Sequence, residues 1–240
     1  MEEIIKIEGW CPICEQSATF IAKGKWYRGT LLCTSCEGGS VPRERALAHV
    51  MSRELPHWRY LSIHESSPVE RGISRKLARE CRHYISSHFF PDSPFGRVVN
   101  GYRNENIEQQ TFESETFDLV VSLDVTEHVF HPDMMFKEIY RTLRPGGFYI
   151  STFPIRKWLV EPTTARARLT TEGKIEHLIE PEYHGNPING DGALVTYDYG
   201  YDIYQMIPHW TPFEVEISRF SNRRLGILGE YTEVIVCRKN

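Results

Sequence analysis

The clearest pattern of hydrophobic and polar positions lies in residues 117–152, FDLVVSLDVTEHVFHPDMMFKEIYRTLRPGGFYIST. The near-continuous apolar run from Leu119 to Leu123 is typical of a parallel strand that is covered on both faces. After Pro132, which suits a first helical turn, apolar residues recur at three- and four-residue spacing and predict one buried helix face. A Pro-Gly-Gly turn ends that helix, and residues 148–152 return as a strand. The segment therefore predicts a β-α-β unit with a right-handed crossover.

Similar periodicity predicts further elements on both sides of this unit. A helix follows Pro42, and another follows Ser67, which is placed as a helix N-cap with Pro68 in the first turn. The remaining expected elements are strands over 60–63, within 83–90, over 213–219 and over 231–238, and a helix over 198–207. Helices that alternate with strands in this order predict an α/β fold with a mostly parallel sheet.

Acidic and imidazole side chains follow the first strand of the β-α-β unit. Asp124, Glu127 and His128 lie in the loop between that strand and the helix. Parallel sheets bind ligands in the loops at the carboxyl ends of their strands, so this loop is a candidate site.

Four of the six cysteines have a spacing that indicates a metal site. Cys11 and Cys14 form one C-x2-C pair, and Cys33 and Cys36 form a second pair after an interval of eighteen residues. Four thiolates at this spacing match a tetrahedral zinc ribbon, and four protein ligands leave no open position for catalysis. Two disulfides or a redox pair are the alternatives. We therefore expect a structural zinc ribbon over residues 1–40, followed by a helical connector over 41–57.

Composition and charge argue against several classes of protein. Charged residues make up 25% of the chain and the net charge is −4, which argues against a nucleic-acid binder that relies on phosphate contacts. No apolar run approaches the about 20 residues that span a bilayer. The acidic start MEEIIKIEGW does not resemble a secretory signal, so we expect a cytoplasmic protein without a membrane partner.

The motifs FDLVVSLDVTEHV and EIYRTLRPGGFYIST resemble the region of the fourth and fifth strands in class I S-adenosylmethionine-dependent methyltransferases. By order of elements the resemblance extends over residues 58–240. It implies a Rossmann-like seven-stranded sheet with helices on both faces, and S-adenosylmethionine bound at the carboxyl ends of the strands.

The resemblance also implies where the methyl donor binds. The loop after the first strand is glycine-rich in most of the family, whereas here it reads His64-Glu65-Ser66-Ser67-Pro68. The resemblance places residues of this loop, of the end of the second strand and of the adenine-contacting region around the donor. The donor-binding set is His64, Glu65, Ser66, Ser67, Ser87, His88, Glu105, Asn106, Ile107 and Asp124. A site that has lost the donor, leaving a scaffold, is the alternative.

Methyl transfer to a hydroxyl or an ammonium group is helped by a general base. His128 is the candidate base, because its reference pKa of about 6.5 lies near neutral pH. Glu127 or Asp124 would orient it, and His131 is a second candidate beside the substrate. The alternative is that Glu127 and His128 only stabilise the loop and wall the pocket.

Residues 154–201 interrupt the alternation of strands and helices with a polar stretch rich in Pro, Gly, Asn and His. Insertions of this length are usually functional or disordered. We expect a substrate lid over the carboxyl edge of the sheet, with Trp158, Tyr183 and His184 facing the acceptor. An ordinary surface excursion is the alternative.

Three functions compete at this point. The leading hypothesis is methyl transfer to a small-molecule or glycan acceptor, since the chain resembles zinc-ribbon-bearing methyltransferases, which are often associated with sugar or secondary-metabolite pathways. A ribosomal-RNA methyltransferase is the second, because some such enzymes also carry a zinc ribbon. A non-catalytic binding module is the third. The sequence leaves the acceptor atom and the oligomeric state undetermined.

Overall fold

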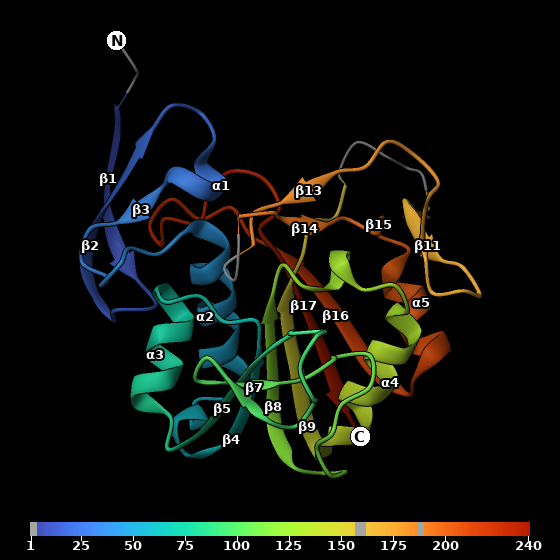
Figure 1. The fold of residues 1–240 in the computed structure, drawn as a ribbon. Helices are drawn as coiled ribbons and strands as arrows, with labels where there is room; N and C mark the ends of the chain where they lie inside the picture. The colour runs from blue at the N-terminus through green and yellow to red at the C-terminus, as the bar shows by residue number, and fades with distance from the viewer. Residues whose placement is uncertain (1–3, 157–161, 187–189) are drawn as a thin grey trace.

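An eight-stranded sheet runs through the centre of the computed structural model, which describes residues 4–156, 162–186 and 190–240 (Figure 1). Its strands in spatial order are β16 (Phe213–Arg219), β17 (Glu233–Lys239), β9 (Leu143–Thr152), β8 (Phe117–Leu123), β4 (Ser62–Ser66), β5 (His83–His88), β7 (Tyr102–Asn104) and β6 (Val98–Val99). Strands from β9 to β7 pair in parallel, whereas β17 pairs antiparallel with both β9 and β16. The expected sheet is confirmed, with β6 added as a short antiparallel partner of β7.

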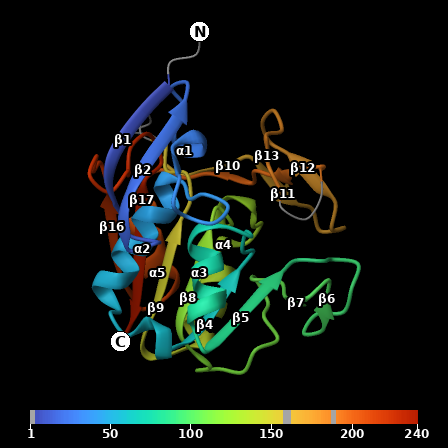
Figure 2. The same cartoon turned by 90° about the vertical axis from the view of Figure 1, so that its left-hand side faces the viewer.

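Helices cover both faces of the sheet, as the two views show (Figures 1 and 2). The helices α2 (Pro42–Glu54) and α3 (Gly72–Glu80) lie on one face, and α4 (Pro132–Thr142) and α5 (Ile203–Trp210) lie on the other. Along β8, Leu119 and Val121 join the first core while Val120 joins the second. This alternation explains why the β8 sequence is apolar at successive positions.

The N-terminal module is a small antiparallel sheet that packs directly on the first core. It consists of β1 (Ile4–Cys11), β2 (Gln16–Lys23) and β3 (Leu32–Cys33), with the short helix α1 (Tyr27–Thr30) between β2 and β3. Phe20 of β2 belongs to the same buried cluster as Leu47 of α2 and Val236 of β17. The module therefore shares its core with the large sheet.

Arg45 of α2 is a structural residue at this junction. Its buried guanidinium donates to the carbonyl oxygens of Leu31 at 2.8 Å, of Gly226 at 2.7 Å and of Ser40, and it lies over the Phe20 ring. Gly226 has a φ of +63°, and a Cβ atom there would lie 2.6 Å from the Phe20 ring. Only glycine therefore allows this close approach.

The β-α-β unit at residues 117–152 is confirmed, with α4 beginning at Pro132 and β9 resuming directly at Leu143. The expected helix start at Ser67 is wrong, because α3 begins at Gly72. Ser67 instead has a φ of +55° in the loop that leaves β4, and its N–H donates to Ser87 at 2.8 Å. The expected helix over 198–207 also begins late, at Ile203.

The insertion forms three two-stranded antiparallel units within its described residues. They pair β10 (Thr164–Ala165) with β15 (Tyr197–Asp198), β11 (Ala167–Leu169) with β12 (Ile175–His177), and β13 (Tyr183–His184) with β14 (Ala193–Leu194). The 3-10 helix η2 (Thr126–His128) lies beneath them, while the other one, η1 (Trp58–Tyr60), precedes β4. Thr196 donates its N–H to the Glu127 carbonyl at 2.8 Å, so the insertion contacts the loop after β8 directly. Among the helices that the structure describes, none has both the length and the apolar character to cross a membrane.

Candidate functional site

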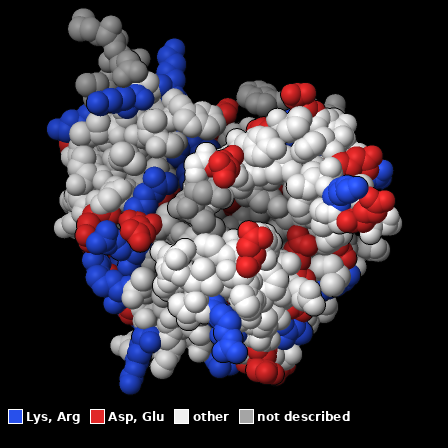
Figure 3. Space-filling view, viewed as in Figure 1, with Lys and Arg blue, Asp and Glu red and all other residues white. Residues whose placement is uncertain are grey.

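Four parallel strands, β4, β5, β8 and β9, end at the same edge of the sheet. The loops that follow them meet the N-terminal module on one side and the insertion on the other (Figure 1). Figure 3 shows that the molecule is hollowed between these two sides, with both basic and acidic side chains along the hollow. This edge therefore contains the candidate site.

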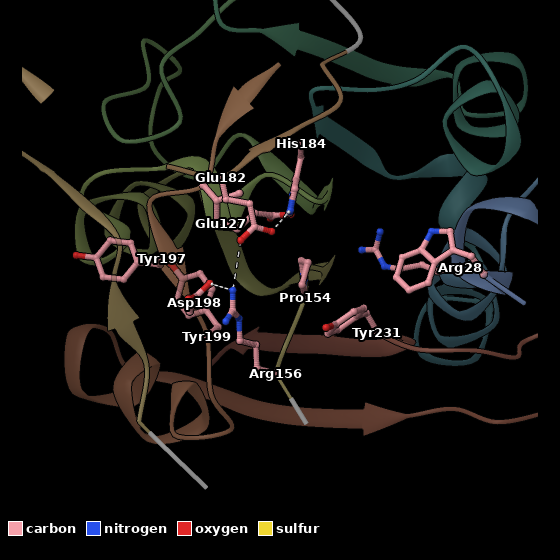
Figure 4. Close-up of a pocket in the computed structure, with 12 residues that line it drawn as sticks. Arg28, Glu127, Pro154, Arg156, Glu182, His184, Tyr197, Asp198, Tyr199 and Tyr231 are labelled. Atoms are coloured by element: carbon pink, nitrogen blue, oxygen red, sulfur yellow. Dashed lines mark hydrogen bonds and ion pairs between the residues drawn. The ribbon is translucent and has the colours of Figure 1, made fainter. Parts of the chain in front are cut away.

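One pocket of about 440 Å³ lies between the module, the loop after β8 and the insertion (Figure 4). Arg28 of α1 and Tyr231 line one side of it, and Glu127 and His184 line another. Arg156 lies 2.6 Å from an oxygen of Asp198 and 3.4 Å from an oxygen of Glu182, and these three also line the pocket. The pocket therefore contains charges of both signs.

Glu127, His128 and His184 form a cluster beside this pocket. The Glu127 side chain is 2% exposed, and neither of its carboxylate oxygens has a hydrogen-bond partner among the described residues. Its Oε1 lies 3.6 Å from Nδ1 of His184 and 3.9 Å from Nε2 of His128. The Glu127 carboxylate raises the pKa of His184. Of these three residues, Glu127 and His184 line the pocket.

Asp124 lies at the start of the same loop with a φ of +54°. Its two carboxylate oxygens lie 2.8 Å from Arg28 Nη2 and 2.8 Å from Arg43 Nε. Burial raises the pKa of Asp124, but the two guanidinium groups outweigh it and hold the pKa below its usual value. This carboxylate therefore joins the N-terminal module to the sheet edge.

A second pocket of about 410 Å³ lies at the carboxyl end of β5. It is lined by the loop residues Pro68, Val69 and Glu70, and by His88 and Tyr102, whose ring centroids are 4.3 Å apart. His88 is buried, and its Nδ1 has no hydrogen-bond partner among the described residues. Burial lowers the pKa of His88. The pocket therefore offers aromatic rings and one carboxylate.

His64 and Glu65, which the sequence placed around the donor, lie instead within β4. His64 Nε2 is 2.8 Å from Ser87 Oγ, its ring stacks on Phe117, and burial lowers its pKa to about 3. Glu65 accepts hydrogen bonds from Ser74 at 2.5 Å and Tyr84 at 2.7 Å, and burial raises its pKa to about 7. Successive strand residues point to opposite faces of the sheet, and both faces are covered, so both side chains are buried. Neither residue lines the first or the second pocket.

The neighbouring donor candidates are also placed by these strands. Ser66 is buried at the end of β4, and the Ser87 hydroxyl is hydrogen-bonded to the His64 ring. Ser67 bridges the ends of β4 and β5 through its backbone. Of the second-strand pair, only His88 lines the second pocket.

The expected adenine-contacting residues are engaged with their own loop. Glu105 accepts from Arg103 Nε at 2.6 Å and from the Thr111 N–H at 2.8 Å. The Asn106 side chain accepts from the Glu108 N–H, and Ile107 is buried in the second core. None of the three lines the two pockets described above.

The expected substrate residues are spread more widely. His184 lines the first pocket, whereas Tyr183 on the same strand is 57% exposed. His131 is exposed immediately before α4. Trp158 lies outside the described residues.

Several site residues were missed by sequence reasoning. Arg28, Arg156 and Tyr231 line the first pocket, and Glu70 and Tyr102 line the second. They come from separate elements that meet only in the folded chain, so no local motif marks them. The glycine-poor loop was the one available signal, because it drew attention to the residues just before Glu70.

The four ribbon cysteines converge as their spacing predicts. Their sulfur atoms all lie within 4.8 Å of one another, with Cys11–Cys36 at 3.5 Å and Cys14–Cys33 at 3.9 Å. A tetrahedral zinc ion with Zn–S bonds of about 2.3 Å separates its sulfur ligands by about 3.8 Å. The sulfur positions therefore fit one zinc ion.

Comparison with known proteins agrees with this architecture. Residues 74–151 match the family described as a methyltransferase domain. No curated protein sequence gives a significant match.

Solved structures share the fold at low identity. An S-adenosylmethionine-dependent methyltransferase of Mesorhizobium loti is 13% identical, with a TM-score of 0.54 over 81% of this chain and 98% of that chain. The PH0226 protein of Pyrococcus horikoshii OT3 is 15% identical, with a TM-score of 0.54 over 82% and 90%. The glycopeptide N-methyltransferase MtfA, in complex with S-adenosylmethionine, is 10% identical, with a TM-score of 0.52 over 82% and 93%. The chain therefore contains a methyltransferase domain at residues 74–151, and its fold, with antiparallel β17 between β9 and β16, is similar to that of solved S-adenosylmethionine-dependent methyltransferases.

Proposed function

We propose that this methyltransferase acts on a small-molecule or glycan acceptor that binds in the 440 Å³ pocket. The pocket has the volume of a small-ligand site. The observation that carries the proposal is its enclosure by the N-terminal module at Arg28 and by the insertion at His184. The net charge of −4 disfavours RNA as the acceptor, because RNA binding relies on contacts between basic side chains and phosphates.

The second pocket supports binding of S-adenosylmethionine, which supplies an electrophilic methyl group on a sulfonium centre. The rings of His88 and Tyr102 would contact the adenosyl group. The Glu70 carboxylate would accept from ribose hydroxyls in place of the acidic residue that the sequence lacks after β5. These residues therefore fit the donor although the loop has no glycine.

The proposed roles at the transfer site follow from placement. Glu127 and His184 would bind and orient the polar group of the acceptor. The insertion would act as the substrate lid and exclude water, because its backbone is hydrogen-bonded to the loop after β8. His128 does not line the pocket, and its Nδ1 donates to the Leu194 carbonyl at 2.8 Å. It would therefore support Glu127 and His184 without contacting the acceptor.

Zinc in the ribbon would have a structural role and stabilise the fold. We place one structural zinc on Cys11, Cys14, Cys33 and Cys36, because all four protein ligands converge there. The division into a ribbon at 1–40, a connector at 41–57 and a methyltransferase domain at 58–240 remains a proposal about sequence units. Their shared core predicts that they unfold together.

Calorimetry with S-adenosylhomocysteine tests the donor site. We expect Glu70→Gln and His88→Ala to weaken binding at least about tenfold, whereas Glu214→Gln on the exposed edge strand leaves it unchanged. Methyl transfer from labelled donor to hydroxylated small molecules and sugars, compared with ribosomal RNA, then tests the acceptor. Absence of binding by the unaltered protein would favour the non-catalytic module, and transfer only to RNA would refute the small-molecule acceptor.

A further inference from the structure

We infer that Glu127, His128 and His184 bind a divalent metal ion at the wall of the acceptor pocket. One carboxylate oxygen and one nitrogen from each imidazole all lie within 4.8 Å of one another. The cluster is separate from the cysteines of the ribbon, and it comes from η2 and from β13 of the insertion.

The buried Glu127 carboxylate is the first argument. It is 2% exposed, and both of its oxygens lack hydrogen-bond partners among the described residues. A buried carboxylate without a partner is costly, and proteins resolve the cost by pairing it or by coordinating a metal. The nearest titratable groups to its Oε1 atom are the two imidazoles, at 3.6 and 3.9 Å, beyond hydrogen-bond distance.

The hydrogen bonds of the two imidazoles provide the second argument. His128 Nδ1 lies 2.8 Å from the Leu194 carbonyl oxygen, so Nδ1 carries the proton and Nε2 has a free lone pair facing Glu127. His184 Nε2 lies 3.3 Å from Glu182, so in the neutral imidazole Nε2 carries the proton and the Nδ1 lone pair faces Glu127 at 3.6 Å. Metal-binding histidines characteristically donate their other nitrogen to a carbonyl or a carboxylate.

The distances are close to those that a metal requires. At bond lengths of about 2.0–2.1 Å, a tetrahedral ion separates its ligand atoms by about 3.3 Å. The separations of 3.6 and 3.9 Å from Glu127 need only small side-chain rotations to reach that value. Two imidazoles and one carboxylate suit zinc, manganese, iron or cobalt, and three protein ligands leave coordination positions open.

The open positions would face the acceptor, because Glu127 and His184 line the 440 Å³ pocket. A metal there would bind and polarise a hydroxyl group as a Lewis acid. This inference rests on the proposed function only in its statement about the acceptor. A metal ion at this position would select acceptors with a hydroxyl group, or with two neighbouring oxygens that chelate the ion. His128 would then be a metal ligand instead of the general base that the sequence suggested.

Manganese is a probe that distinguishes this site from the ribbon, since thiolates select zinc whereas carboxylate and imidazole groups accept manganese. We would titrate the full chain, with its ribbon metal retained, with MnCl₂ by calorimetry and electron paramagnetic resonance. We expect about one Mn²⁺ per chain, no detectable binding by Glu127→Gln or His184→Ala, and binding about 10- to 100-fold weaker in Glu182→Gln. His177→Ala, at an exposed position in β12 outside the cluster, should bind like the unaltered protein.

S-adenosylhomocysteine binding, measured on the same samples, reports separately on the donor site and on folding. Variants that retain it but lose Mn²⁺ support the inference. The inference is overturned if Mn²⁺, Co²⁺ and Zn²⁺ all fail to bind beyond the ribbon metal, or if Glu127→Gln binds Mn²⁺ normally. If Mn²⁺ binds while S-adenosylhomocysteine does not, the proposed function fails and the metal site stands.

Discussion

The Nε atom of Arg43 lies 2.8 Å from the carboxylate of Asp124. This contact joins the first turn of α2 to the loop after β8, and Arg28 of α1 holds the other oxygen of the same carboxylate. Both guanidinium groups and the carboxylate are mostly buried, with side chains 13–18% exposed. The N-terminal module is therefore fixed to the edge of the sheet where the pockets lie.

Replacing Asp124 by Asn should destabilise the protein markedly. The change leaves two mostly buried guanidinium groups without their counter-ion, and removal of one partner from such a cluster costs about 3 kcal/mol in free energy of unfolding. Urea denaturation measures the effect. Asp133→Asn is the matched control, because its pair with Lys137 is exposed and contributes about 0.5 kcal/mol or less. Equal losses in the two variants would contradict the docking role of Asp124.

Gly72 should tolerate no side chain. Its φ is +53°, and a Cβ atom there would lie 2.2 Å from an oxygen of Glu44, which itself accepts the Val41 N–H at the start of α2. Gly72→Ala is therefore expected to lower the free energy of unfolding by about 2–4 kcal/mol, from backbone strain and displacement of a buried carboxylate. Gly101→Ala isolates the strain, because φ there is +85° and no atom lies within 4 Å. We expect a loss of only about 1 kcal/mol in that control; similar losses in both variants would remove the steric argument.

How far the sequence predicted these features depends on how local each one is. The apolar run of β8 and the cysteine spacing are local, and both predictions agree with the structure. The burial of His64 and Glu65 was not predicted, because β4 continues to Ser66 and both faces of the sheet are covered, so side chains on either face of the strand are buried. The partners of Asp124 lie 96 and 81 residues away in the chain, and no periodicity reports such a distance.

The ribbon should hold one zinc ion that stabilises the whole chain. Cys14→Ser is expected to lower the zinc content by about one ion per chain relative to the unaltered protein and to lower the melting temperature, because metal binding supplies folding energy and the ribbon shares its core with the sheet. Metal analysis and thermal denaturation measure the two effects. Cys81→Ala, a buried cysteine outside the cluster, should retain its zinc. Full zinc content in Cys14→Ser would show that the four sulfurs do not form the site.

The neighbours His64 and Glu65 should make opposite contributions to stability as pH changes. Burial lowers the pKa of His64 to about 3, so the unfolded chain binds its proton first and stability falls as pH drops from about 6.5 towards 3. Burial raises the pKa of Glu65 to about 7, so the folded chain keeps a proton that the unfolded chain loses, and stability falls as pH rises from about 4.3 to 7. Between about pH 4.5 and 6.5 the two slopes cancel.

Glu65→Gln should expose the contribution of His64 alone. The amide still accepts from Ser74 or Tyr84 and does not titrate, so one opposing slope disappears. We expect the free energy of unfolding of this variant to rise by about 1.4 kcal/mol per pH unit relative to the unaltered protein between about pH 4.5 and 6.5. Urea titrations at half-unit intervals measure the difference, with Glu214→Gln as a control that should follow the unaltered protein because its side chain is exposed. Parallel pH profiles for Glu65→Gln and the unaltered protein would mean that the Glu65 carboxyl group is ionised inside the fold.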